Sequence, residues 1–203
     1  VSQQPSILQA YLWPRVDAEI VQTLPWRQSS WDVDLWSLAL SQAARCGRSS
    51  AFELGARMLP GPCGAASQLL ANAPDGLTAL QLLCIASARL SPLLTPRLLV
   101  TSGRAWLWWM PSCRIPPALK AWLADFHHAA LKSLLTQRAG TGCDGTWHFA
   151  RTAPSDLSVC WSHLGQGLRH GCQADAASFP ISAITRPGLM PLDRQRWLAQ
   201  EAL

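Results

Sequence analysis

Lysine and tyrosine are almost missing from this chain of 203 residues, which contains two lysines and one tyrosine. Because the lysines are Lys120 and Lys132 and the arginines are scattered singly, the formal net charge of +5 comes without a basic run or stripe. Acidic residues are also few, twelve in all, and they form no paired-carboxylate pattern. The sequence therefore argues against nucleic acid as a partner and gives no acid–base pair for catalysis.

Long apolar runs are missing as well. The longest nearly apolar stretch, residues 77–88, is interrupted by Thr78 and Gln81, and residues 1–7 carry no basic segment followed by an apolar one. This predicts neither a membrane span nor a signal peptide. The seven cysteines are odd in number and irregular in spacing, which is typical of reduced intracellular thiols. We therefore expect a cytoplasmic protein that reaches a membrane only through another protein.

Tryptophan, by contrast, is abundant, with eleven residues among the 49% of the chain that is hydrophobic. A Trp side chain buries a large ring at low conformational cost and often anchors a protein interface. Eleven such rings point to contact surface, although a helical core built on Trp and Leu is an equally weighted alternative.

Helical spacing of apolar residues recurs along the chain, whereas strand-like alternation is nearly absent. The prediction is an all-α fold, a single irregular helical domain over residues 1–203, with a Gly-rich link at 138–154 that contains a possible short strand near 147–151. The expected helical segments are 32–46, 50–59, 65–71, 77–90, 93–100, 105–110, 118–137, 156–169 and a last one from 193, with 179–184 extended.

Known catalytic and cofactor motifs fail in their context. Gly140, Gly142 and Gly145 match G-x-G-x-x-G, but a long helix precedes them where a dinucleotide loop needs a strand. His127-His128 indicates one half-buried and one exposed histidine. The sequence predicts a non-enzyme without cofactor or metal.

A second reading comes from a local group of cysteines and histidines that could supply four zinc ligands. No C-x-x-C pair fixes their spacing, so packing is the simpler explanation. A small cytosolic zinc protein or Cys/His enzyme remains an alternative, and so does a helical nucleic-acid-binding module. The residues of the group are Cys143, His148, Cys160, His163, His170 and Cys172.

The run LTALQLLCIASARLSPLLTPRLLVTSGRAWLWW at 77–109 resembles the central segment of the K subunit of bacterial type III secretion systems. AYLWPR at 10–15, LPWR at 24–27, the segment 156–169 and FPISAITRP at 179–187 are loosely similar to that family as well. The resemblance implies a non-enzymatic adaptor at the cytosolic face of the inner membrane. Such an adaptor links the inner-membrane ring protein to the pod of the sorting platform, and the family supplies no catalytic residues.

The expected binding surface is the tryptophan segment with its flanking arginines. Three large rings within four residues cannot all point inward from one short helix, so at least one should face solvent. Arginine beside exposed Trp is also the composition of an interface hot spot. The candidate residues are Arg104, Trp106, Trp108, Trp109 and Arg114.

Overall fold

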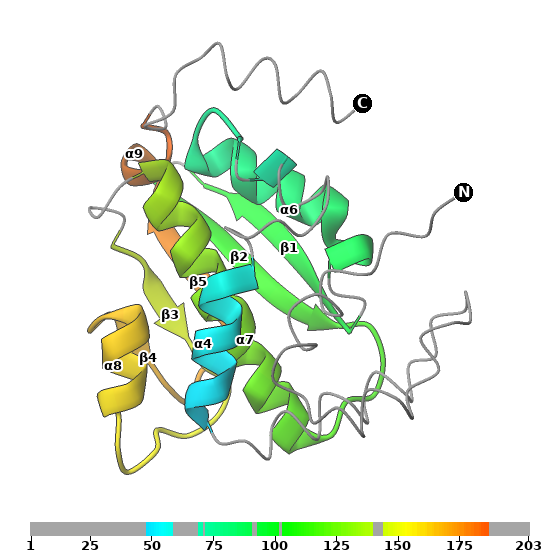
Figure 1. Ribbon diagram of the computed structural model, residues 1–203, viewed down its shortest axis with the longest axis vertical. Helices are drawn as coiled ribbons and strands as arrows, with labels where there is room; N and C mark the ends of the chain where they lie inside the picture. Colours follow the sequence, from blue (N-terminus) through cyan, green and yellow to red (C-terminus); the bar gives the residue numbers. More distant parts are fainter. Residues whose placement is uncertain are drawn as a thin grey trace.

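The part of the chain that the structure describes folds into a five-stranded mixed sheet with helices on one side (Figure 1). This structure is a computed structural model, and the residues described are 48–58, 69–70, 72–90, 93–101, 103–139 and 144–186. The helices are α4 (Arg48–Met58), α6 (Gly76–Leu90), α7 (Pro117–Ala139), α8 (Ser158–Leu164) and α9 (Ile181–Ile184). The strands are β1 (Leu94–Val100), β2 (Arg104–Pro111), β3 (Thr146–His148), β4 (Leu168–Arg169) and β5 (Ala176–Pro180).

The all-α prediction is wrong, because two segments expected to be helical pair as an antiparallel hairpin. Strands β1 and β2 lie in register from Leu94 opposite Pro111 to Val100 opposite Ala105. At the turn, the Thr101 amide and hydroxyl both donate to the Arg104 carbonyl, at 2.9 and 3.0 Å. Side chains in β2 alternate between buried and half-exposed, the period of a strand with one covered face. The fold is mixed α/β.

The sheet order is β1-β2-β5-β3-β4, so β5, the last strand within the described residues, lies in the middle. Strand β5 is antiparallel to both β2 and β3, and β3 is parallel to β4. The short strand expected near 147–151 lies at β3, and the segment 156–169 divides into α8 and β4. Segment 179–184, expected to be extended, is the end of β5 followed by α9.

Helices α6 and α7 begin where the sequence places helix signals. The Thr78 amide donates to the Asp75 carboxylate at 2.7 Å, which makes Asp75 the N-cap of α6. Pro117 occupies the first helical position of α7, where a missing N–H costs nothing. Both helices cover the same face of the sheet, and α4 packs against α7 on the side away from it (Figure 1).

Helix α7 is buried on nearly all sides because it lies between two layers. Every residue from 122 to 131 is buried, including the polar Asp125 and the two adjacent histidines. On the sheet side His128 contacts Trp147, and on the other side Trp122 donates from Nε1 to the Ser50 hydroxyl of α4. The core continues into the sheet through Leu107, Trp147 and Phe179, all fully buried.

Some expectations concern residues outside the described ranges. These are the helices at 32–46 and from 193, most of the segment 65–71, and residues 140–143 of the Gly-rich link. Gly145 of that link is described and lies under the ring of Phe179, where an added Cβ would stand 2.3 Å from a ring carbon. Among the helices of the described residues, none combines the length and the apolar character that crossing a membrane requires.

Candidate functional site

The two faces of the sheet differ in composition. Residues paired across an antiparallel ladder point to the same side, so the register separates an inner face from an outer face. The inner face carries Ala105, Leu107 and Trp109 and packs on the helices. The outer face is the side away from the described helices, and its larger side chains are Arg97, Leu99, Arg104, Trp106, Trp108, Met110, His148 and Arg169.

Arg104 holds the centre of the outer face together. Its Nη2 donates to the hydroxyl of Ser178 at 2.9 Å and to the carbonyl of the same residue at 3.3 Å. A longer bond of 3.4 Å reaches the Thr146 hydroxyl on β3. The guanidinium therefore lies across β5, and the outer surface of three strands is tied together by one side chain.

Aromatic rings form a row beside this guanidinium. The Trp106 and Trp108 rings lie 6.4 Å apart and nearly parallel, and the Trp106 ring lies 5.2 Å from that of His148. Both tryptophans are half-buried, whereas Leu99 and Met110 at the rim are 48% and 50% exposed. The outer face thus offers partly accessible rings with exposed aliphatic side chains on one flank.

The outer face is positively charged. Arg97 and Arg169 are exposed, Arg104 is half-buried, and the outward positions of the five strands hold no Asp or Glu. Partial burial lowers the pKa of His148, and the cations Arg169 and Arg104 lower it further. Both effects favour the neutral form of this histidine, which adds an aromatic ring to the outer face.

The structure separates the five predicted interface residues. Arg104, Trp106 and Trp108 lie together on the outer face, but Trp109 is 3% exposed on the inner face, against the His127 ring. Arg114 is exposed in the segment between β2 and α7, outside the outer face. The grouping assumed one short helix, and strand alternation sends neighbouring side chains to opposite faces instead.

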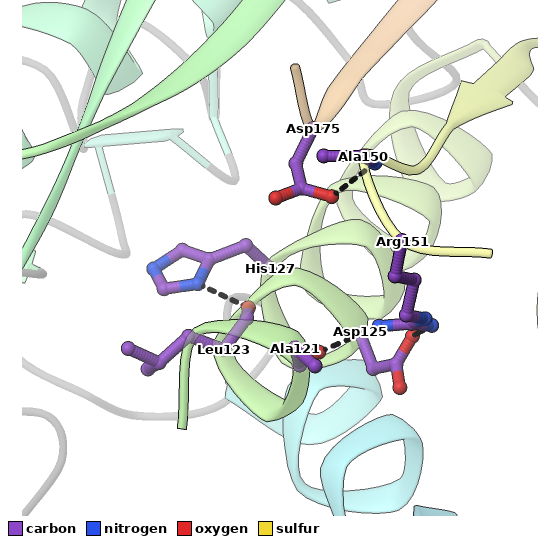
Figure 2. A network of polar contacts seen from close by, with 7 residues as sticks. All are labelled: Ala121, Leu123, Asp125, His127, Ala150, Arg151 and Asp175. Carbon is purple, nitrogen blue, oxygen red and sulfur yellow. Dashed lines mark hydrogen bonds and ion pairs between the residues drawn. The ribbon is translucent and has the colours of Figure 1, made fainter. Parts of the chain in front are cut away.

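A second polar group lies behind the inner face and joins two loops to α7 (Figure 2). Arg151 donates from Nη2 to the Asp125 carboxylate and from Nη1 to the Ala121 carbonyl at 2.8 Å. In the neighbouring loop, the Asp175 carboxylate accepts from the Ala150 amide at 2.9 Å and lies 3.9 Å from the Lys120 ammonium. The loop that follows β3 and the loop that precedes β5 are therefore held to one helix.

His127 belongs to the same region without joining the ion pair. Its Nδ1 lies 2.7 Å from the Leu123 carbonyl, and since a carbonyl only accepts, this nitrogen carries the proton. Figure 2 shows His127 and Asp125 on opposite sides of α7. Asp125 pairs with Arg151 and His127 with the Leu123 carbonyl, and these buried pairings are those of a structural network.

Both adjacent histidines are buried, contrary to the prediction of one half-buried and one exposed residue. Burial lowers the pKa of His127 from 6.5 to about 4, partly offset by its bond to Leu123. Burial also lowers the pKa of His128 to about 3, with further repulsion from Arg151, His127 and His148. Both shifts favour the neutral form of these rings in the folded chain.

Stability should therefore fall in mild acid. In the unfolded chain, His127 and His128 bind protons below about pH 6.5. In the folded chain they bind protons only near pH 4 and pH 3, because burial lowers their pKa values. The free energy of unfolding, measured by urea titration, is expected to fall by about 3 kcal/mol between about pH 6.5 and pH 5. His128→Leu removes one of the two groups and should roughly halve the slope; an unchanged slope would contradict this assignment.

The cysteines and histidines weighed as zinc ligands are mostly dispersed. Cys160 is in the core, His163 stacks on Phe52 at 5.1 Å, and His170 stacks on Phe149 at 4.8 Å. Cys172 and His148 approach each other, with Sγ 3.8 Å from Nδ1, and Cys143 lies outside the described ranges. Within the ranges that the structure describes, no three metal-binding side chains gather around one point.

Comparisons with known proteins find a likeness in fold alone. No protein-family model matches the chain, and no curated protein matches it significantly. A crystal structure of the transcriptional regulator CdpR from Pseudomonas aeruginosa is similar, with a TM-score of 0.69 and 12% sequence identity. The match covers 96% of this chain and 61% of the regulator. The description as a helical secretion protein is thereby corrected: the fold is mixed α/β, and a solved structure that it resembles is that of a regulator.

Proposed function

We propose that this chain is a non-catalytic regulatory domain of a transcription regulator. The observation that carries the proposal is the likeness in fold to CdpR over 96% of the chain. None of the described helices carries a row of arginines that could enter a DNA groove. The chain also spans only 61% of the regulator's length. In this proposal the contacts with DNA belong to a further part of the regulator, and the present fold controls them from the cytoplasm.

The polar network behind the sheet supports a regulatory rather than a chemical role. Asp125 and Asp175 are buried and both are committed to partners on neighbouring elements. The partly exposed rings and cations lie instead on the outer face, where a partner can reach them. The outer face is thus suited to binding, and the buried polar groups stabilise the fold. A domain that receives a signal needs both features.

Chromatin immunoprecipitation of the epitope-tagged full-length protein tests this role. We expect enrichment at a small set of promoters, and deletion of the gene should change the transcripts of the same operons. Uniform recovery of chromosomal DNA, with unchanged transcripts on deletion, would contradict the proposal. The secretion-adaptor prediction has support from none of the three comparisons, and recovery of the tagged protein with the inner-membrane ring would favour it instead.

A further inference from the structure

The outer face has the composition of a protein interface. Surfaces that bind proteins are enriched in Trp, Met and Arg and depleted in Lys, Glu, Asp, Ser and Ala. The outward positions of the five strands hold two Trp, one Met and three Arg, and no Lys, Glu or Asp; of the depleted types only the small Ala176 and Ser178 of β5 lie among these positions. This composition is found on one face of one sheet, although its residues come from segments far apart in the chain.

The charge of the outer face has no counterpart on the face itself. Among the described residues, Lys120 and Arg151 form ion pairs with Asp175 and Asp125, and both pairs lie behind the sheet. One transverse row of the sheet places Arg97 on β1 and Arg169 on β4, with Trp108 and His148 between them. Two exposed guanidinium groups thus stand at the two sides of a partly apolar strip.

We propose that the outer face docks an acidic segment of a protein partner, whose carboxylates pair with Arg97 and Arg169 and whose apolar side chains pack on Trp108 and Met110. Arg104 ties β2 to β5 through its bonds to Ser178, so it positions the surface. This inference does not depend on a role in transcription, because it rests on the composition and charge of the face.

Two other occupants fit less well. A second copy of the same face would place arginines opposite arginines, and Arg97, Arg104 and Arg169 would repel those of the other copy. A single-stranded nucleic acid would stack on the tryptophans, but its phosphates would meet the exposed aliphatic side chains of Leu99 and Met110. An acidic segment that also carries apolar residues satisfies both the cations and the aliphatic flank.

The experiment measures binding of a fluorescein-labelled peptide of repeated Asp-Phe-Glu-Leu to the purified chain by anisotropy. Controls are a charge-reversed Lys-Phe-Lys-Leu peptide, a Glu-Gly peptide of equal charge, and oligothymidylate. We expect preference for the acidic-apolar peptide, weakened by salt. Trp108→Ala and Arg97→Glu should each weaken it about tenfold or more, and Arg57→Glu, an exposed arginine on α4, should leave it unchanged.

Circular dichroism and the unfolding midpoint of each variant separate loss of binding from loss of fold. Because Arg97 is exposed, the Arg97→Glu variant keeps the test valid if Trp108→Ala does not fold. Equal binding of the Glu-Gly peptide would reduce the face to a non-specific cation patch and overturn the proposal. So would tighter binding of oligothymidylate, or a concentration-dependent dimer that Arg97→Glu abolishes.

Discussion

Replacing Gly55 by alanine is expected to lower the free energy of unfolding by about 2–4 kcal/mol. Helices α4 and α7 approach so closely here that an added Cβ would stand 2.1 Å from the Phe126 carbonyl oxygen and 3.0 Å from the Ala129 Cβ. The obstacle is backbone of a buried helix, which cannot rotate away as a side chain can. Alanine would gain about 1 kcal/mol in helix propensity, and the overlap outweighs that gain.

Urea unfolding of Gly55→Ala against the parent chain measures this effect. Gly103→Ala is the matched control, because an added Cβ in the β1–β2 turn meets nothing within 4 Å. That variant should unfold within about 0.5 kcal/mol of the parent. If Gly55→Ala were as stable as the parent, α4 could not pack against α7 at this distance.

Replacing Arg151 by methionine is also expected to lower the free energy of unfolding strongly. The change leaves Asp125, whose side chain is 2% exposed, without its guanidinium partner, and it also removes the bond to the Ala121 carbonyl. Removing one member of a buried ion pair costs about 3–5 kcal/mol. The guanidinium also lies 4.5 Å from the centre of the Phe149 ring, a contact that methionine retains only in its apolar part.

A double variant separates the charge effect from packing. Arg151→Met together with Asp125→Leu removes both charges, so it should be more stable than Arg151→Met alone. The coupling energy from the four unfolding curves is expected to be about 1–3 kcal/mol. Strictly additive losses would mean that the two side chains stabilise the fold independently.

The sequence predicted the long helices well and the sheet poorly. Segments 77–90 and 118–137 carry start signals at Asp75 and at Pro116-Pro117, and the structure has α6 and α7 there. Residues 93–100 and 105–110 are apolar runs too short for periodicity to decide between helix and strand. The Thr101–Gly103 turn between runs rich in Leu, Val and Trp was the available strand signal.

The outer face could be predicted only in part. Arg104, Trp106 and Trp108 are close in sequence, and a strand assignment would have grouped them and excluded Trp109. His148 and Arg169 reach the same surface through pairing with β5 and β3, a register that no local pattern encodes. The Asp125–Arg151 pair was missed for the same reason. A polar side of α7 is expected to face solvent, and only the fold shows that the loop carrying Arg151 covers it.

The central position of β5 sets the order in which this fold can be completed. The β1–β2 hairpin can form as soon as it is made, but β3 and β4 have no contact with it until β5 is inserted between them. Residues 176–180 therefore close the sheet over sequence separations of about 30 to 75 residues, which slows folding relative to local pairing. During synthesis, β1–β2 and β3–β4 therefore cannot join into one sheet until Pro180 has left the ribosome.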